Sequence, residues 1–266
     1  MTAQVFHEEF GSGVPVLALH GWTPDHRMMS GCLEPVFAER PGYRRLYPDL
    51  PGMGKSPGGS ARGSDDLLAA VSSFADEHLG AEPFLLVGES YGGYLARALV
   101  RERPGQVRGM ALICPIGTEP EHARRTLPPH TVLRSDPALI ASMDAAEAAD
   151  FTEIAVVRSP EILARYRAEV APGLALADET TLARVRENYT LSVPPESGPA
   201  YERPVLVLTG RQDSITGYED QYALLGHYPR ASFAVLDRAG HNLQLEQPAL
   251  FGALLAEWLD RVAESG

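Results

Sequence analysis

The sequence predicts an α/β protein in which helices cover both faces of a mostly parallel sheet. Short apolar runs recur along the chain, and most of them end in Gly, Pro or Asp. Near-continuous apolar runs are typical of strands buried on both faces, as in parallel sheets covered by helices. The 266 residues are enough for one substantial hydrophobic core with an inserted segment, but few for two independent domains.

Six runs have the strand pattern, and stretches with helical character separate most of them. The runs are Val14–Gly21, Tyr43–Gly52, Pro83–Ser90, Val107–Gly117, Pro204–Asp213 and Ser232–His241. The pattern predicts crossover helices over Asp65–Gly80 and Tyr91–Arg103, the first with Ser64 as its N-cap and the second stopped by Pro104. A last helix begins at Pro248 and presents an apolar face to the sheet.

The region between residues 118 and 200 breaks this alternation, because no strand-like run interrupts its helical pattern. Two helix starts are recognisable there, at Ser135-Asp136-Pro137 and Ser159-Pro160-Glu161, since each offers a capping side chain followed by proline. We therefore predict a first part of the core over residues 1–117, a helical cap over 118–200 and a second part of the core over 201–266.

Composition narrows the class of protein and its partners. The 35 acidic and 23 basic residues give a net charge of −12, which repels phosphate backbones and anionic lipids and argues against nucleic acid or a membrane as a partner. No apolar run approaches the ~20 residues of a membrane helix, and the N-terminus lacks a signal-peptide pattern, so we expect a cytoplasmic protein. Cys32 and Cys114 form no CxxC pair and are predicted to be buried free thiols.

A candidate nucleophile lies in Gly88-Glu89-Ser90-Tyr91-Gly92, which fits the pattern G-x-S-x-G. A buried strand runs into this segment and a helix leaves it, which is the context that lifts a serine hydroxyl above a sheet. The alternative is that Ser90 only caps the following helix. The crowding of Gly88, Gly92 and Gly93 in one turn favours the nucleophile, because these glycines let the helix pass close to the strand.

A serine hydroxyl needs a base and an acid that orients the base. His241 follows the last strand-like run and Asp213 ends the run before it, both at strand ends where open α/β sheets build their sites. The chain order Ser, Asp, His supports this set. Asp220 is the rival acid, but its surroundings have a helical pattern, and Asp237 is expected to form a salt bridge.

Two backbone N–H groups should stabilise the oxyanion of the intermediate. We assign them to Tyr91, the residue after the nucleophile, and to Trp22 in the loop after the first buried strand, with Thr23 as the second choice. His20 is expected to brace this loop. The remaining histidines are expected at the surface: His7, His26, His78, His122, His130 and His227.

These segments resemble blocks of the α/β-hydrolase superfamily, in its branch with a helical cap. The matching blocks are His20-Gly21-Trp22, the segment from Asp49 to Ser56, Gly88 to Gly93, Gly210 to Asp213 and Ala239-Gly240-His241. The resemblance implies an eight-stranded, mostly parallel sheet whose first two strands lie near residues 2–14, with the cap inserted after the sixth strand.

The resemblance also indicates which activities of the superfamily are compatible with these motifs. Haloalkane dehalogenases and epoxide hydrolases of this fold carry aspartate where this chain has Ser90, so those chemistries are excluded. Proline iminopeptidases usually show HGGPG where this chain has HGWTP, and carbon–carbon hydrolases typically show G-N-S-M-G-G, but both alternatives stay open.

The expected function is hydrolysis of a small carboxylic ester, a small-molecule substrate, without cofactor or metal. A ligand receptor on the same fold is the alternative from another class. Phe151, Tyr166 and Tyr189 are the candidate pocket residues of the cap, and the sequence leaves the oligomeric state open.

Overall fold

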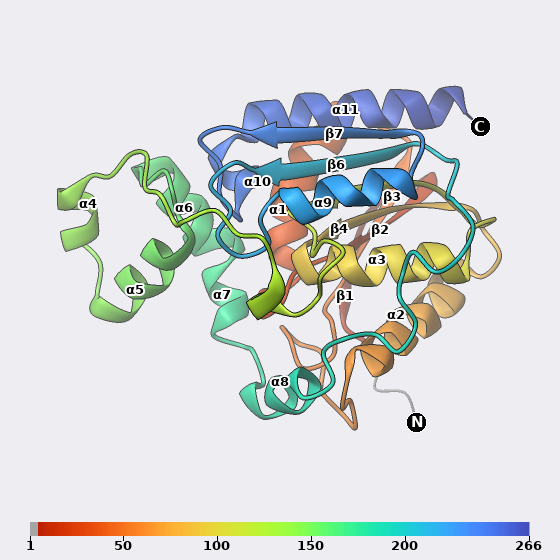
Figure 1. The fold of residues 1–266 in the computed structure, drawn as a ribbon, viewed down its shortest axis with the longest axis horizontal. Coiled ribbons are helices and arrows are strands. Elements are labelled where there is room, and N and C mark those ends of the chain that lie inside the picture. The colour runs from red at the N-terminus through yellow and green to blue at the C-terminus, as the bar shows by residue number, and fades with distance from the viewer. Residues whose placement is uncertain (1–4, 266) are drawn as a thin grey trace.

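A sheet of seven strands runs through the centre of the molecule, with helices on both of its faces (Figure 1). The structure is a computed structural model, and it describes residues 5–265. In chain order the strands are β1 His7–Gly11, β2 Val14–Leu19, β3 Tyr43–Pro48, β4 Phe84–Glu89, β5 Val107–Ile113, β6 Val205–Gly210 and β7 Ala231–Leu236.

The strand order is β1-β3-β2-β4-β5-β6-β7, with β1 antiparallel to β3 and every other pair parallel. The predicted fold class, a mostly parallel sheet between helices, is therefore confirmed. The described residues contain one strand fewer than the eight that the resemblance implies. A single short strand, β1, precedes Val14, and residues 1–4 lie outside the described part of the chain.

Eleven α-helices connect and cover the strands in residues 5–265. They are α1 His26–Ala38, α2 Ser64–Leu79, α3 Ser90–Glu102, α4 Pro137–Ala141, α5 Ala145–Ile154, α6 Pro160–Glu169, α7 Ala171–Leu174, α8 Glu179–Arg186, α9 Glu219–Tyr222, α10 Leu243–Glu246 and α11 Pro248–Glu264, with short 3₁₀ turns at His122–Arg124 and Ala223–Gly226. None of these helices is both long and apolar enough to cross a membrane.

Two apolar layers hold the helices against the sheet. Phe74 of α2 and Leu95 of α3 pack on one face, whereas Leu33 of α1 and Trp258 of α11 pack on the other. Trp258 is fully buried, and its indole N–H donates to the Pro204 carbonyl at 3.1 Å, so the polar atom of this side chain has a partner. The long apolar runs of the central strands are explained by this burial on both faces.

The helices α4 to α8 lie in the segment between β5 and β6, and α4, α5 and α6 project from one end of the sheet (Figure 1). Phe151 and Tyr166 belong to a separate apolar cluster, which also contains Met28 of α1 and Leu245 of α10. The segment thus has a small core of its own that rests on the sheet domain. Its exact limits, at residues 118 and 200, stay a prediction.

The carboxyl ends of β4, β6 and β7 lie at the same edge of the sheet, because these strands are parallel members of one continuous sheet. Loops that leave this edge carry Ser90, Asp213 and His241. The chain topology therefore brings together three residues that are separated by up to 151 positions in the sequence.

Candidate active site

Ser90 occupies a sharp turn between β4 and α3. Its φ angle is 50°, in the left-handed region that non-glycine residues rarely adopt. The glycines of this turn are required by close approach: a Cβ on Gly92 would lie 2.3 Å from the Leu19 carbonyl oxygen, and one on Gly88 would lie 2.6 Å from the Gly92 carbonyl oxygen. The backbone thus places the Ser90 hydroxyl at the end of the strand.

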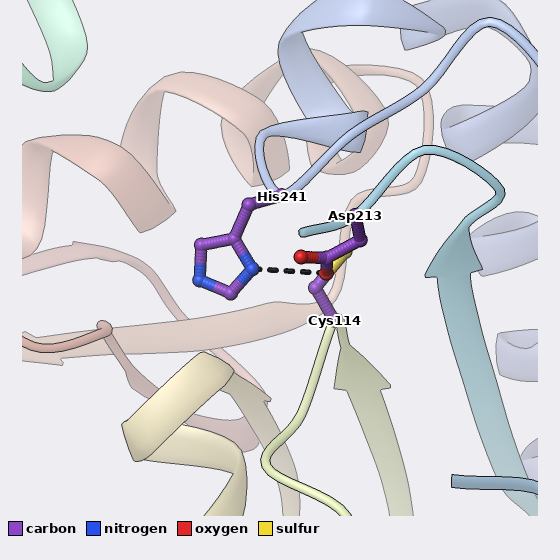
Figure 2. Close-up of side chains that lie close together, drawn as sticks. All are labelled: Cys114, Asp213 and His241. Atoms are coloured by element: carbon purple, nitrogen blue, oxygen red, sulfur yellow. Dashed lines mark hydrogen bonds and ion pairs between the residues drawn. The ribbon is translucent and has the colours of Figure 1, made fainter. Parts of the chain in front are cut away.

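His241 lies between β7 and α10, and its imidazole links the other two predicted residues. Its Nε2 atom is 2.9 Å from the Ser90 Oγ atom, and its Nδ1 atom is 3.0 Å from the Asp213 Oδ2 atom. Figure 2 shows the imidazole facing the Asp213 carboxylate. The structure therefore brings the three predicted residues into one continuous chain of hydrogen-bonded side chains.

Asp213 is fully buried and is held by the turn that follows β6. Its Oδ1 atom accepts hydrogen bonds from the N–H groups of Ile215 and Thr216, and the Thr216 hydroxyl lies 2.8 Å from its Oδ2 atom. Burial opposes ionisation, but His241 and the Thr216 hydrogen bonds hold the pKa of Asp213 below its ordinary value. Asp213 is therefore an ionised and fixed partner of the imidazole.

Burial alone would lower the pKa of His241, but the Asp213 carboxylate, through charge and hydrogen bonding, raises it to about 9. Glu89 adds a further negative charge near the ring. The imidazole of the resting protein is thus easily protonated, and it becomes a free base only as the pH rises.

Glu89 is a site residue that the sequence reasoning missed. Its Oε1 atom lies 3.5 Å from His241 Nε2 and has no hydrogen-bond partner in residues 5–265, although the side chain is only 1% exposed. Burial raises its pKa to about 7, while His241 and the N–H of Gly21 oppose that shift. A glutamate within the buried run PFLLVGES was the available signal, because an ionisable side chain is rarely buried without a role.

Glu246 of α10 is a second residue that was missed, and it joins the His241 loop to the inserted helices. One carboxylate oxygen accepts from the Gly240 N–H at 2.6 Å, and the other accepts from the N–H groups of Val156 and Val157 at 2.8 and 3.2 Å. Burial raises the pKa of Glu246 to about 7. The sequence contained no local signal for these contacts, since they join positions up to 90 residues apart.

A cavity of about 440 Å³ opens beside Ser90 and His241. Its apolar wall includes Met28, Tyr166, Val170 and Leu174. Tyr166 therefore lies where the sequence interpretation put it.

The other two predicted pocket residues do not line this cavity. Phe151 packs on Tyr166 inside the cluster of the inserted helices, with ring centroids 5.3 Å apart. Tyr189 packs on Trp22 and Tyr91 instead. Packing on other aromatic rings buries these side chains just as cavity lining would, and the sequence pattern could not distinguish the two.

Four carboxylates line the same cavity: Glu89, Asp150, Glu153 and Glu179. No lysine or arginine is among the described residues that form its wall. The Asp150 and Glu153 side chains lie near Tyr166, whose pKa is raised to about 12, first by burial and then by these two charges and Glu147. The side chains of the cavity wall therefore include more acidic than basic groups.

The expected oxyanion donors lie beside this cavity. Trp22 is part of its wall, and Tyr91 is the second residue of α3, where the N–H has no carbonyl of its own helix to bind. The Tyr91 side chain points elsewhere, and its hydroxyl donates to the Ser64 Oγ atom at 2.7 Å. Both backbone N–H groups thus belong to segments that border Ser90, and their role as donors stays a prediction.

His20 and His26 are both buried and hydrogen-bonded in the structure. His20 braces its loop as expected: its Nδ1 atom lies 2.7 Å from the Gly21 carbonyl oxygen and its Nε2 atom accepts from the Leu50 N–H. The expectation of a surface position was wrong for His26, which is 1% exposed and hydrogen-bonds Asp49 at 2.7 Å. Asp49 lies 23 residues away in the sequence, so local context could not reveal the pairing.

The rival acids are placed away from the imidazole. The Asp220 Oδ2 atom accepts from the Thr126 N–H, and Asp237 accepts from the Gln212 side chain instead of forming the expected salt bridge. Cys32 and Cys114 are buried free thiols, as predicted.

Two buried groups contain the residue types that metals prefer: Cys114 with Asp213 and His241, and Asp25 with His26 and Asp49. In each group a histidine nitrogen and a carboxylate oxygen lie only 3.0 or 2.7 Å apart, at hydrogen-bond distance. An ion would have to separate these pairs. The donor sets therefore fit hydrogen bonding better than a metal.

Comparison with known proteins gives the family. A family model described as alpha/beta hydrolase fold matches residues 14–248. The crystal structure of an alpha/beta superfamily hydrolase from Oenococcus oeni PSU-1 matches with a TM-score of 0.90 at 30% identity, covering 97% of this chain and 96% of that chain.

Two curated relatives differ in how much of the chain they share. A 2-hydroxy-6-oxononadienedioate/2-hydroxy-6-oxononatrienedioate hydrolase of Paraburkholderia phymatum is 28% identical over 96% of this chain and 91% of that protein. Haloalkane dehalogenase 2 of Mycobacterium tuberculosis is 31% identical over 41% of this chain, and the match spans only 37% of that protein. The family match extends over most of the chain, and the chain belongs to the α/β-hydrolase family.

Proposed function

We propose that this α/β hydrolase is a serine hydrolase that cleaves small carboxylic esters through an acyl-enzyme on Ser90. The observation that carries the proposal is the hydrogen-bonded chain from Ser90 Oγ to His241 Nε2, 2.9 Å, and from His241 Nδ1 to Asp213, 3.0 Å. A base within hydrogen-bond reach of the hydroxyl, itself oriented by a carboxylate, is what activates a serine as a nucleophile.

In the first half of the reaction Ser90 Oγ attacks the ester carbonyl while His241 Nε2 takes the hydroxyl proton. The N–H groups of Tyr91 and Trp22 stabilise the oxyanion of the tetrahedral intermediate. His241 then donates its proton to the leaving alcohol, and the acyl group stays on Ser90. In the second half a water molecule, deprotonated by the same imidazole, releases the acid.

Asp213 acts through the imidazole. It accepts the hydrogen bond of the Nδ1 proton, which leaves Nε2 free to face Ser90, and it stabilises the imidazolium that forms during the reaction. Because the pKa of His241 is raised to about 9, the activity of the free enzyme should rise with pH up to about that value.

Other activities of the fold are less well supported. Dehalogenation requires the aspartate that Ser90 replaces. Carbon–carbon hydrolysis is the second candidate, because the Paraburkholderia phymatum relative matches along most of the chain. By its name that relative acts on a dicarboxylate, whereas the described residues that line the cavity here include four carboxylates and no lysine or arginine, so we place ester hydrolysis first.

The test is a substrate panel with purified protein. p-Nitrophenyl esters of graded acyl length should be hydrolysed over many turnovers, and Ser90→Ala should reduce kcat by at least about 10³-fold, since only binding and the oxyanion donors remain. Proline and alanine p-nitroanilides should be poor substrates, and their preferential hydrolysis would favour an aminopeptidase. Release of no more than one equivalent of product would favour a ligand receptor.

A further inference from the structure

Glu89 has a buried carboxylate oxygen that lacks a hydrogen-bond partner in the described part of the chain, directly at the proposed reaction centre. Glu89 is one of the residues that line the cavity, and its buried Oε1 atom, 3.5 Å from His241 Nε2, accepts no hydrogen bond within residues 5–265. An unsatisfied buried carboxylate is costly, because it loses its hydration without replacement. Because Glu89 is part of the cavity wall, a bound molecule can supply the missing partner, as a hydrogen-bond donor or as a positive charge.

The location of Glu89 indicates which part of a substrate would meet it. His241 Nε2 takes the Ser90 proton and delivers it to the leaving group, so the atoms beside Nε2 belong to the leaving-group side of the reaction centre. Glu89 Oε1 lies next to that same nitrogen. A group that pairs with Glu89 therefore belongs to the leaving alcohol and not to the acyl group.

The outer part of the cavity also favours a positively charged group. Asp150 and Glu153 of α5 and Glu179 at the start of α8 line the wall with exposed side chains, and none forms an ion pair within 4.0 Å in the described chain. Arg125 and Arg186 are the basic residues nearby, but neither lines the cavity: Arg125 donates to the carbonyls of Glu119, Pro120 and Ile215, and Arg186 lies over the Trp22 ring.

From these two observations we infer that the enzyme prefers esters whose leaving alcohol carries a positively charged nitrogen. The exposed carboxylates attract such a substrate, and Glu89 binds its cationic group beside the scissile bond. This inference rests on the proposed ester hydrolysis and adds the substrate class.

Three butyrate-type esters test the inference. Butyrylcholine carries the charge on the alcohol, 3,3-dimethylbutyl butyrate is its uncharged analogue of the same shape, and ethyl 4-(trimethylammonio)butyrate carries the charge on the acyl side. We expect kcat/KM for butyrylcholine to exceed that for the uncharged ester by at least about 10-fold, a usual factor for one pocket contact. The acyl-side cation should gain less than this.

The ratio between the first two esters is the readout in the variants, because changes at His241 affect both esters equally. Glu89→Gln should lower the ratio clearly and leave only the preference that comes from the exposed carboxylates. Glu77→Gln, which removes an exposed carboxylate of α2 outside the cavity wall, should leave it unchanged. Should Glu89→Gln fold poorly, the triple change Asp150→Asn, Glu153→Gln and Glu179→Gln at exposed positions should lower the ratio and weaken its dependence on salt.

The possible outcomes distinguish a failure of the proposed ester hydrolysis from a failure of the inferred cation preference. Hydrolysis of none of these esters nor of any p-nitrophenyl ester would refute the proposed function and the inference with it. Efficient hydrolysis with a ratio of one or less in the wild type would refute only the cation preference. A larger gain for the acyl-side cation would show that Glu89 faces the acyl subsite, and a ratio unchanged in Glu89→Gln and in the triple variant would overturn the assignment of these carboxylates.

Discussion

Three carboxylates act on His241 from different sides, and each does so through a different contact. Asp213 binds Nδ1 at 3.0 Å, Glu89 faces Nε2 at 3.5 Å, and Glu246 holds the N–H of the preceding Gly240. In the proposed mechanism the first orients the ring and the second adds charge beside the atom that moves the proton, while the third holds the loop. Replacement of each should therefore produce a distinct defect.

At the residue scale, replacing Asp213 and Asp220 separately tests which of the two acids orients His241. Asp213→Asn should reduce kcat by about 10⁴-fold, because the amide favours the wrong tautomer of His241. Asp220→Asn should change kcat little, since Asp220 accepts only from the Thr126 N–H. Steady-state kinetics on a p-nitrophenyl ester measures both, and a larger loss in Asp220→Asn would show that the acid was assigned wrongly.

Glu89 should affect the pH dependence of the reaction. The titratable groups that interact with its charge are His241 and Asp213, together with the Cys32 and Cys114 thiols, whose raised pKa values keep them neutral. Arg125 acts on His241 and lowers the pKa of the imidazole. The Glu89 charge raises the pKa of His241, so Glu89→Gln should lower it. The acidic limb of the pH profile of kcat/KM should then move to lower pH. An unchanged limb would refute the electrostatic coupling between Glu89 and His241.

At the scale of helices and strands, the sequence predicted the features that depend on a local residue pattern. The buried strands, the Ser90 turn and the strand ends that carry Asp213 and His241 were all found from apolar runs and short motifs. Glu89, Glu246 and the His26–Asp49 pair were missed, because their roles depend on contacts between segments that are far apart in the chain. Of the three candidate pocket residues only Tyr166 lines the cavity, because the sequence pattern does not distinguish packing from cavity lining.

Glu246 connects α10, the His241 loop and the inserted helices, so its loss should affect stability and catalysis together. Glu246→Ala removes the acceptor of three buried N–H groups, and an unsatisfied buried donor costs about 1–3 kcal/mol. We expect the free energy of unfolding, measured with denaturant, to fall by about 3 kcal/mol or more, with a lower kcat.

Glu246→Gln is the control, because its amide oxygen still accepts part of these bonds. It should lie between wild type and Glu246→Ala in both measurements. Wild-type stability and kcat in Glu246→Ala would contradict a role of this contact in positioning His241.

At the scale of the whole molecule, the sheet domain carries the three proposed reacting residues, and the inserted helices supply one wall of the cavity. Tyr166 lines that wall, whereas Phe151 packs behind it. Tyr166→Ala should change the preference between short and long acyl chains by about 10-fold, the usual effect of one pocket contact. Phe151→Leu should change it less, and a loss of all activity in folded Tyr166→Ala protein would show that the cap contributes a reacting group.

Covalent acylation of Ser90 is the step on which the other assignments depend. p-Nitrophenyl N,N-dimethylcarbamate is a suitable probe, because a carbamoyl group leaves a serine slowly and accumulates. The wild-type chain should release about one equivalent of p-nitrophenol in a burst and gain the mass of one carbamoyl group, located on Ser90 by peptide mapping. An adduct on another residue, or an unmodified Ser90 in protein that still hydrolyses esters, would contradict a serine acyl-enzyme.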